Sequence, residues 1–186
     1  MVLDKSFNKI NFYAQPLEGL EYDGCAFNNC NFSKTNLSNI SFIDCTFLNC
    51  DFSNAQLNNT GFQEVVFVSS KLIGLRFDTC KWFLLQFTFK NCILNYSSFY
   101  GLKIPNTQFG ASSLIEVDFT EVDARSADFS SCNLTAAVFE NSILEGADFR
   151  MAENFAINPE SNYIRKAKFT KDDLLGLLWN YNLVVE

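Results

Sequence analysis

The side chains of this protein that can take part in chemistry are mainly its thiols and carboxylates. The sequence contains seven cysteines, 21 acidic residues and no histidine. The missing histidine removes the side chain most often used as a general base and as a metal ligand. The sequence also has no serine in a nucleophile-elbow motif and no glycine-rich phosphate loop. These observations predict a protein that is not an enzyme and that binds no metal or cofactor.

The acidic residues are concentrated in the last third of the chain. Residues 116 to 160 contain ten acidic and two basic side chains, whereas residues 64 to 115 contain five basic and two acidic ones. Eight of the acidic residues are candidates for binding a partner protein: Glu116, Asp118, Glu121, Asp123, Asp128, Glu140, Glu145 and Asp148. The alternative is a solvated wall with no partner. The net charge of −7 argues against direct nucleic-acid binding, which needs a basic surface.

A five-residue period positions these side chains. Every fifth residue from Phe7 to Phe87 is large and apolar, which fits neither the period of a helix nor that of a simple strand. Similar residues also recur every 20 positions: Phe7, Phe27, Phe47, Phe67 and Phe87 form one column, and Tyr22, Phe42, Phe62 and Trp82 form another. Four fives predict a four-sided coil with one inward-pointing residue, the centre, on each side.

All the cysteines occupy one place in this period. They lie two residues before a predicted centre, where the residues are small or of medium size: Cys25, Cys30, Cys45, Cys50, Cys80, Cys92 and Cys132. A free cysteine behaves as a small buried hydrophobe, so we expect reduced thiols that fill the core. A disulfide between cysteines stacked one coil apart is the alternative.

The pattern resembles that of the pentapeptide-repeat proteins. Their unit is a small residue, Asp or Asn, Leu or Phe, and two polar residues, and residues 30–59 (CNFSKTNLSNISFIDCTFLNCDFSNAQLNN) match it six times in succession. The resemblance covers residues 5 to 152. It implies an all-β fold, a right-handed, four-sided parallel β-helix of about seven coils. We therefore expect a β-helix over residues 1–152, followed over residues 153–186 by an exit loop, a partial coil and a capping helix.

The period is interrupted once, near residues 88–93. The next centre after Phe87 is Leu94, so two extra residues enter the coil in this segment. The stretch 81–91 is too apolar for the interior, and we expect Phe83 and one of Phe87 or Phe89 to lie outside or in a bulge. One interpretation is a local bulge, and the other is an exposed aromatic patch for a partner.

The C-terminal segment predicts a short helix over residues 171–181, KDDLLGLLWNY, with Thr170 and Asp173 as its start signal. Residues 182–185, NLVV, predict a short strand. The helix is apolar on more than one face, so one face can cap the open end of the β-helix. The other face predicts a homodimer through the C-terminal ends. The candidate dimerisation residues are Leu174, Leu175, Leu177, Leu178 and Trp179.

Within the family, the chain resembles the Qnr and MfpA quinolone-resistance proteins, which are dimeric DNA mimics. The shared features are the length, the apolar C-terminal helix and the acidity next to it, whereas the projecting loops of Qnr are missing. The resemblance implies a protein that binds DNA gyrase or topoisomerase IV and modulates it or confers quinolone resistance. The alternative is a scaffolding rod with no topoisomerase role. No apolar run is long enough for a membrane span, and no signal segment begins the sequence, so we expect a cytoplasmic protein.

Overall fold

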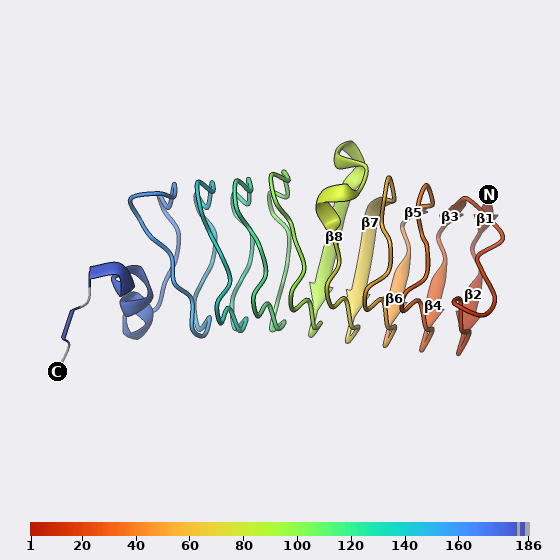
Figure 1. Ribbon diagram of the computed structural model, residues 1–186, viewed down its shortest axis with the longest axis horizontal. Helices are drawn as coiled ribbons and strands as arrows, with labels where there is room; N and C mark the ends of the chain where they lie inside the picture. The colour runs from red at the N-terminus through yellow and green to blue at the C-terminus, as the bar shows by residue number, and fades with distance from the viewer. Residues whose placement is uncertain (182, 185–186) are drawn as a thin grey trace.

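The computed structural model describes residues 1–181, 183 and 184, whose backbone winds into a parallel β-solenoid. Figure 1 shows the turns stacked along one axis, with the N-terminus at one end and the last helices at the other. The strands are β1 Val2–Leu3, β2 Ser6–Asn8, β3 Glu21–Asp23, β4 Ala26–Asn28, β5 Ser41–Ile43, β6 Thr46–Leu48, β7 Gly61–Val68 and β8 Leu85–Lys90. Four 3-10 helices complete the structure: η1 Phe77–Thr79, η2 Trp82–Leu84, η3 Asp172–Leu177 and η4 Trp179–Tyr181.

The strands pair in the register that the 20-residue period predicts. Phe27 of β4 lies opposite Phe7 of β2 and Phe47 of β6, and all of these pairs are parallel. The strands cover the first five turns, and later turns pair through single bridges such as Asp128 with Asp148. The short strands follow from the sequence, because every five-residue unit contains a turn that ends the extended backbone.

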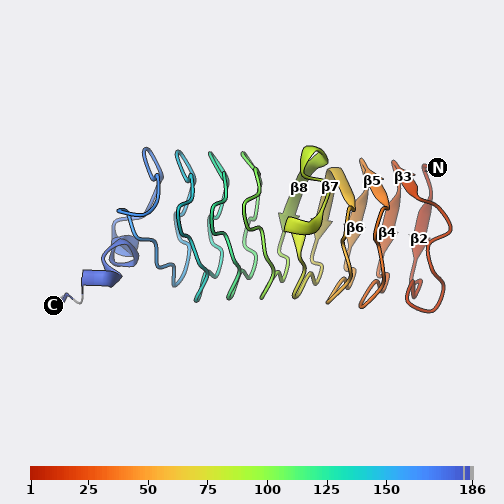
Figure 2. The same ribbon diagram turned by 45° about the horizontal axis from the view of Figure 1, so that its top comes forward.

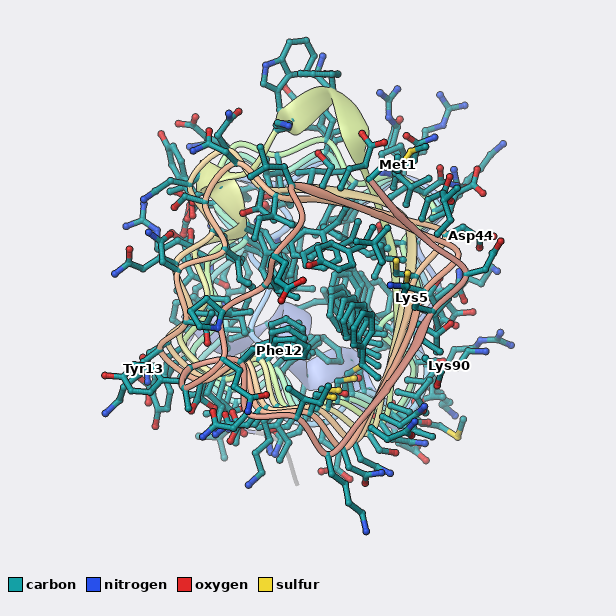
Figure 3. The ribbon with its side chains drawn as sticks, turned by 90° about the vertical axis from the view of Figure 1, so that its right-hand side faces the viewer. Met1, Lys5, Phe12, Tyr13, Asp44 and Lys90 are labelled. Atoms are coloured by element: carbon teal, nitrogen blue, oxygen red, sulfur yellow. The ribbon has the colours of Figure 1, made fainter. Side chains whose placement is uncertain are left out.

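The inward centres form four columns, one for each side of the solenoid. We name the sides by these centres: side A has Phe27, Phe47, Phe109 and Phe129; side B has Phe32, Phe52, Leu114 and Leu134; side C has Leu37, Leu57, Phe119 and Phe139; side D has Phe42, Phe62, Ala124 and Leu144. All of these side chains are buried. Figure 3, a view along the axis, shows the rings stacked behind one another inside the coil.

Aromatic stacking follows directly from the register. The rings of Phe27 and Phe47 are parallel, with centroids 4.8 Å apart, and those of Phe109 and Phe129 are 4.9 Å apart. Rings of neighbouring sides instead meet edge to face, as Phe47 and Phe52 do at 5.0 Å. Both arrangements are favourable for aromatic side chains, and they explain why phenylalanine is the commonest centre.

The turns need a left-handed backbone two residues after most centres. Asn29, Asn49 and Asn106 have φ values of 55°, 54° and 62°. Asparagine tolerates this conformation better than most residues, which accounts for its frequency at this place in the repeat. The polar outer positions are therefore selected partly by backbone geometry.

The structure corrects the predicted path through the interruption. Trp82 was expected as a buried centre, but it lies outside and is 75% exposed. Phe87 and Phe89 are both buried, so the expectation that one of them lies outside was also wrong, whereas the exposure of Phe83 is confirmed. The ring of Phe89, not Phe87, stacks on Phe67 at 5.4 Å and continues the side-A column. The extra residues therefore enter before Phe89, within the segment 82–87.

The reason for this path lies in the pairing of β7 with β8. Phe62 pairs with Leu85, and the register then shifts so that Val65 pairs with Phe87. The ring of Phe87 lies 5.4 Å from that of Phe77 and fills the interior in place of Trp82. The chain between Lys81 and Leu85 consequently leaves the coil as the helix η2.

The C-terminal end is capped by two short 3-10 helices and not by the single helix that the sequence predicted. The Thr170 hydroxyl hydrogen-bonds the Asp173 carboxylate at the start of η3. The N–H of Ile157 donates to the carbonyl of Gly176 at 3.0 Å, which docks η3 on the last turn. A Cβ atom at Gly176 would lie only 2.4 Å from the Phe155 ring, so this close contact requires glycine. The predicted strand falls partly outside the described residues, and Leu183 and Val184 are not in a strand.

Candidate functional site

Four of the eight predicted partner-binding residues gather on side C. Asp118 lies on this side, where it is bridged to Ser98 in the preceding turn and to Val138 in the next. Glu116 and Glu121 occupy the two corners that flank Asp118 in the same turn, and Glu140 follows one turn later at the same corner as Glu121. The three glutamates are exposed and Asp118 is half-buried. We call these four residues the side-C acidic patch.

The other four acidic residues lie elsewhere on the coil. Asp128 and Asp148 are stacked on side A, as their 20-residue separation requires, while Asp123 lies on side D. Glu145 stands at the corner between sides D and A. The structure therefore brings together only half of the predicted set, because a five-residue repeat turns the chain by one side at each unit.

The aspartates also have a structural role that sequence reasoning missed. A carboxylate oxygen of Asp118 accepts a hydrogen bond from the N–H of Thr120 at 2.9 Å. Asp128 accepts one from the N–H of Ser130, also at 2.9 Å, and Asn31 does the same for Ser33. These contacts are Asx turns, which Asp and Asn form equally well. The alternation of Asp and Asn at this place in the repeat was the available signal.

Two of the acidic residues are neutralised by arginine. Arg125 forms an ion pair with Asp123 and Arg150 forms one with Asp148, each with an N–O distance of 2.6 Å. The two aspartate side chains are only 10% and 14% exposed. Hydrogen bonds from Arg125 and Arg150 lower the pKa values of Asp123 and Asp148. Within the described part of the chain, no residue of the side-C acidic patch takes part in an ion pair.

Two tyrosines stand next to the side-C acidic patch. The hydroxyl of Tyr100 donates to the Glu121 carboxylate at 3.1 Å, and this bond raises the pKa of Tyr100. Tyr96 lies at the corner between sides B and C and is also exposed. Both were missed from the sequence, although their outer places in the repeat are visible in it. They add an apolar surface to a site that is otherwise charged.

The C-terminal cap presents a second candidate surface. Leu174, Leu175, Leu178 and Trp179 are exposed, and Trp179 is 55% exposed. Leu177, also predicted at the dimer contact, is partly buried and packs against the core of the coil. Tyr181 joins the exposed group and donates from its hydroxyl to Glu160 at 2.7 Å. The cap thus has the two faces predicted for it, one packed and one open.

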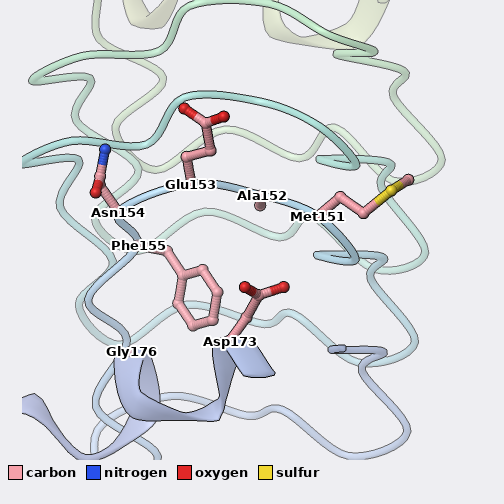
Figure 4. A pocket seen from close by; sticks show the side chains of 7 residues that line it. All are labelled: Met151, Ala152, Glu153, Asn154, Phe155, Asp173 and Gly176. Atoms are coloured by element: carbon pink, nitrogen blue, oxygen red, sulfur yellow. The ribbon is translucent and has the colours of Figure 1, made fainter. Parts of the chain in front are cut away.

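A notch of about 340 Å³ lies where the cap meets the last turn. Figure 4 shows Phe155 beside Gly176, with the carboxylates of Glu153 and Asp173 at the rim. Asp173 is already bonded to Thr170, and the notch is open to solvent. We assign it no ligand.

The cysteines lie in the core as reduced thiols, as predicted, and all seven are free and buried. Burial raises the pKa values of Cys45, Cys50 and Cys132 to about 12. The Cys50 thiol donates to the carbonyl of Phe27, a residue 23 positions earlier, at 3.3 Å. A protonated thiol with an acceptor is a poor nucleophile, because the thiolate is the reactive form.

This geometry defines a four-sided parallel β-solenoid that is built from five-residue units and displays charged and apolar surfaces. The chain belongs to the pentapeptide repeat family, whose model, described as a pentapeptide repeat region, matches residues 20–88 and 76–149. No curated protein sequence matches it. Among the described residues, no helix has the length and apolar character needed to cross a bilayer.

Several solved structures have a similar fold, and two of them illustrate the likeness. One is a trypsin-treated variant of QnrB1, described as a plasmid-mediated fluoroquinolone resistance protein. It is 16% identical, with a TM-score of 0.66 over 100% of this chain and 97% of QnrB1. The other is HetL from Nostoc sp. strain PCC 7120, a pentapeptide repeat protein involved in heterocyst differentiation regulation. It is 14% identical, with a TM-score of 0.67 over 89% of this chain and 84% of HetL. At such identities the likeness establishes the fold alone.

Proposed function

We propose that the protein is a non-enzymatic binding protein whose side-C acidic patch enters a basic, DNA-binding channel of a partner protein. The supporting observation is the set of four carboxylates within two successive turns of one side. Two turns span about 10 Å of axis at a strand spacing of about 4.8 Å. The patch therefore carries about one charge per 2.4 Å, compared with about one per 1.7 Å in duplex DNA.

The candidate partner is a type II topoisomerase, DNA gyrase or topoisomerase IV, and such a partner implies a cytoplasmic location. The fold shared with QnrB1, a fluoroquinolone resistance protein, supports this choice. The similarly close fold of HetL, a protein of developmental regulation, favours the second candidate function, a scaffold that binds some other protein. Both candidates are binding functions, and they differ in the partner.

A gyrase supercoiling assay with two matched variants tests the proposal. The first variant neutralises the side-C acidic patch by Glu116→Gln, Asp118→Asn, Glu121→Gln and Glu140→Gln. The control removes the same number of charges elsewhere by Asp123→Asn, Asp128→Asn, Glu145→Gln and Asp148→Asn. Asparagine keeps the Asx turns, so both variants should fold. We expect the native protein and the control to inhibit supercoiling and the first variant to lose at least about 90% of the inhibition, as charge-dominated binding predicts.

Salt and quinolone complete this test. Binding that imitates DNA should weaken steeply between low and physiological salt and should compete with duplex DNA. Equal inhibition by the two variants would refute the side-C acidic patch as the binding surface. Failure of the native protein to inhibit or bind gyrase at any concentration would favour the scaffold. Adding quinolone to the same assay shows whether binding also protects the enzyme.

We also propose that the C-terminal ends of two copies pair. The exposed apolar side chains of Leu174, Leu175, Leu178 and Trp179 support this contact, because a partner copy can bury them. A two-fold arrangement uses the same surface on both chains and closes the assembly at two copies. It also doubles the length of the rod that a large partner can contact.

A further inference from the structure

An aromatic projection interrupts the otherwise smooth side D. It consists of Trp82 and Phe83 on η2, whose ring centroids are 5.8 Å apart, and we call it the aromatic knob. Figures 1 and 2 show η2 standing out from the middle of the rod. The two side chains are 75% and 64% exposed, although the interior next to them accepts Phe77 and Phe87. Such large exposed rings are unusual on a soluble surface and indicate a contact site.

The aromatic knob lies at the middle turn of side D. The successive turns of this side have Val2, Tyr22, Phe42, Phe62, Leu85, Ile104, Ala124, Leu144 and Ile164 as inward residues. We number these turns 1 to 9, so that the aromatic knob belongs to turn 5. Four turns precede it and four follow it, and the Lys81 side chain extends over Gly61 of turn 4 to the Ser41 hydroxyl of turn 3.

The charges near this side change sign at the aromatic knob. On side D and its corner with side A, the early turns hold Asp4, Glu21, Asp23, Asp44 and Glu64. Two cations accompany them: Lys5, and Lys81, whose ammonium donates to the Ser41 hydroxyl of turn 3 at 3.1 Å. The later turns hold Lys103, Arg125, Arg165 and Lys166, with Asp123 and Glu145. Asp4, Asp44, Glu64, Lys103, Arg165 and Lys166 are all exposed, and none takes part in an ion pair within the described chain.

We propose that side D binds a second copy of this chain in antiparallel orientation, with the two-fold axis passing through the aromatic knobs. The axis places turn 1 of one copy opposite turn 9 of the other, so that Asp4 faces Arg165 and Lys166. It also places Glu64 in turn 4 opposite Lys103 in turn 6. Each of these contacts occurs twice, because the interface uses the same surface on both copies.

The remaining turns also follow from this symmetry. Asp44 in turn 3 faces Arg125 in turn 7, which is already paired with Asp123 of its own chain. Asp23 in turn 2 faces Glu145 in turn 8, which is an unfavourable contact. A parallel pairing of the same sides would set every charge against its own copy, so charge complementarity selects the antiparallel orientation. The aromatic knobs meet at the centre and supply the apolar contact. The C-terminal cap stays outside this interface, so the contact is independent of pairing through the ends.

Carbodiimide cross-linking of the full chain tests the arrangement. The reagent joins a carboxylate to a nearby lysine amine, and an equal mixture of unlabelled and ¹⁵N-labelled protein identifies links between copies by mass spectrometry. Asp4 and Lys166 lie eight turns apart in one chain, roughly 38 Å at a spacing of about 4.8 Å, so a link between them must join two copies. We expect mixed-label links for both Asp4–Lys166 and Glu64–Lys103.

Other results would overturn the proposal. An Asp4–Lys166 link without Glu64–Lys103 would indicate head-to-tail stacking, and links confined to the C-terminal cap would leave end pairing as the sole contact. Leu178→Glu with Trp179→Glu blocks pairing through the ends. If this end-blocked chain forms no mixed-label link and sediments as a monomer at high micromolar concentration, self-association through side D is excluded.

Exchanging the charges of Glu64 and Lys103 tests the same contact independently, by measuring the self-association of the chain that carries Leu178→Glu and Trp179→Glu. Glu64→Lys should weaken the antiparallel association about tenfold, because two ion pairs become repulsive. Adding Lys103→Glu to this variant should restore the association, and Glu145→Lys alone should strengthen it. Lys34→Glu, an exposed residue away from side D, changes the net charge as Lys103→Glu does and should have no effect. Failure of the exchange to restore association would contradict the facing of Glu64 and Lys103.

Discussion

At the scale of the residue, one place in the repeat serves two purposes. Asp118 and Asp128 point negative charge at solvent, and each also accepts the N–H that closes its turn. The outward charge is therefore not by itself a sign of function, because Asn31 forms the same turn without it. Glu116, Glu121 and Glu140 accept no such backbone bond among the described residues, so closing a turn does not account for these three charges.

Because its cysteines are buried, the folded protein loses stability as the pH becomes alkaline. The folded state raises the pKa of Cys132 to about 12, whereas an unfolded thiol has a pKa of about 8.5. The folded chain therefore keeps protons that the unfolded chain releases. The stabilisation is complete below about pH 8.5 and is lost progressively as the pH rises toward 12, by up to about 1.4 kcal/mol per pH unit for each thiol.

Urea unfolding at pH 7 and pH 10 measures this effect. We expect a clear loss of stability at pH 10, and a smaller loss in Cys132→Ala, which removes one titrating thiol. Ellman's reagent should label none of the cysteines in the folded protein at pH 7 and all of them in urea. Rapid labelling of the folded protein, or an identical loss in the variant, would show that thiol burial is not the cause.

At the scale of the element, the columns of stacked aromatic rings stabilise the coil. Phe47 stacks between Phe27 at 4.8 Å and Phe67 at 5.1 Å, and it is completely buried. Phe47→Ala should therefore cost about 3–5 kcal/mol, since the rigid neighbouring turns limit collapse of the cavity. Chemical denaturation checks this value. Thr46→Ala, an exposed neighbour, is the control, and a loss below about 1 kcal/mol for Phe47→Ala would contradict the stacking.

The coils were predictable because the same five-residue pattern, with one large apolar residue in each unit, is repeated along the chain. The phase from Phe7 to Phe77 fixes four inward columns, and the pairing of Phe27 with Phe47 confirms it. The path near Trp82 was not predictable, because Leu85, Phe87 and Phe89 lie too close together for the period to choose among them. The pairing of β8 with β7 makes that choice through contacts far apart in the sequence. The grouping of the acidic residues by side needed no such contacts, because all eight lie in the regular repeat after the interruption, where bridges such as that of Asp128 with Asp148 keep the 20-residue spacing.

At the scale of the whole molecule, the exposed cap predicts an end-to-end dimer. Leu178→Glu with Trp179→Glu should shift the protein toward the monomer by at least about a hundredfold in dissociation constant, because buried like charges replace apolar contacts. Sedimentation measures the shift, and circular dichroism checks that the coil persists. Lys171→Glu with Asp172→Lys, which changes exposed polar residues of the cap, is a control. A native chain that is monomeric at micromolar concentration would exclude this dimer.

The interruption at turn 5 has a consequence for how the rod bears tension. Side A remains stacked across it, with Phe67 and Phe89 inclined by 13°. Side C is also stacked across it, with Phe77 and Phe99 4.6 Å apart. On side D, Phe62 meets Phe87 only as a tilted ring, with centroids 6.5 Å apart. Force applied at the two ends passes through every turn in series, because each turn contacts only its neighbours. Side D is therefore the weakest contact across the interruption, and we expect a pulling force to open this side first.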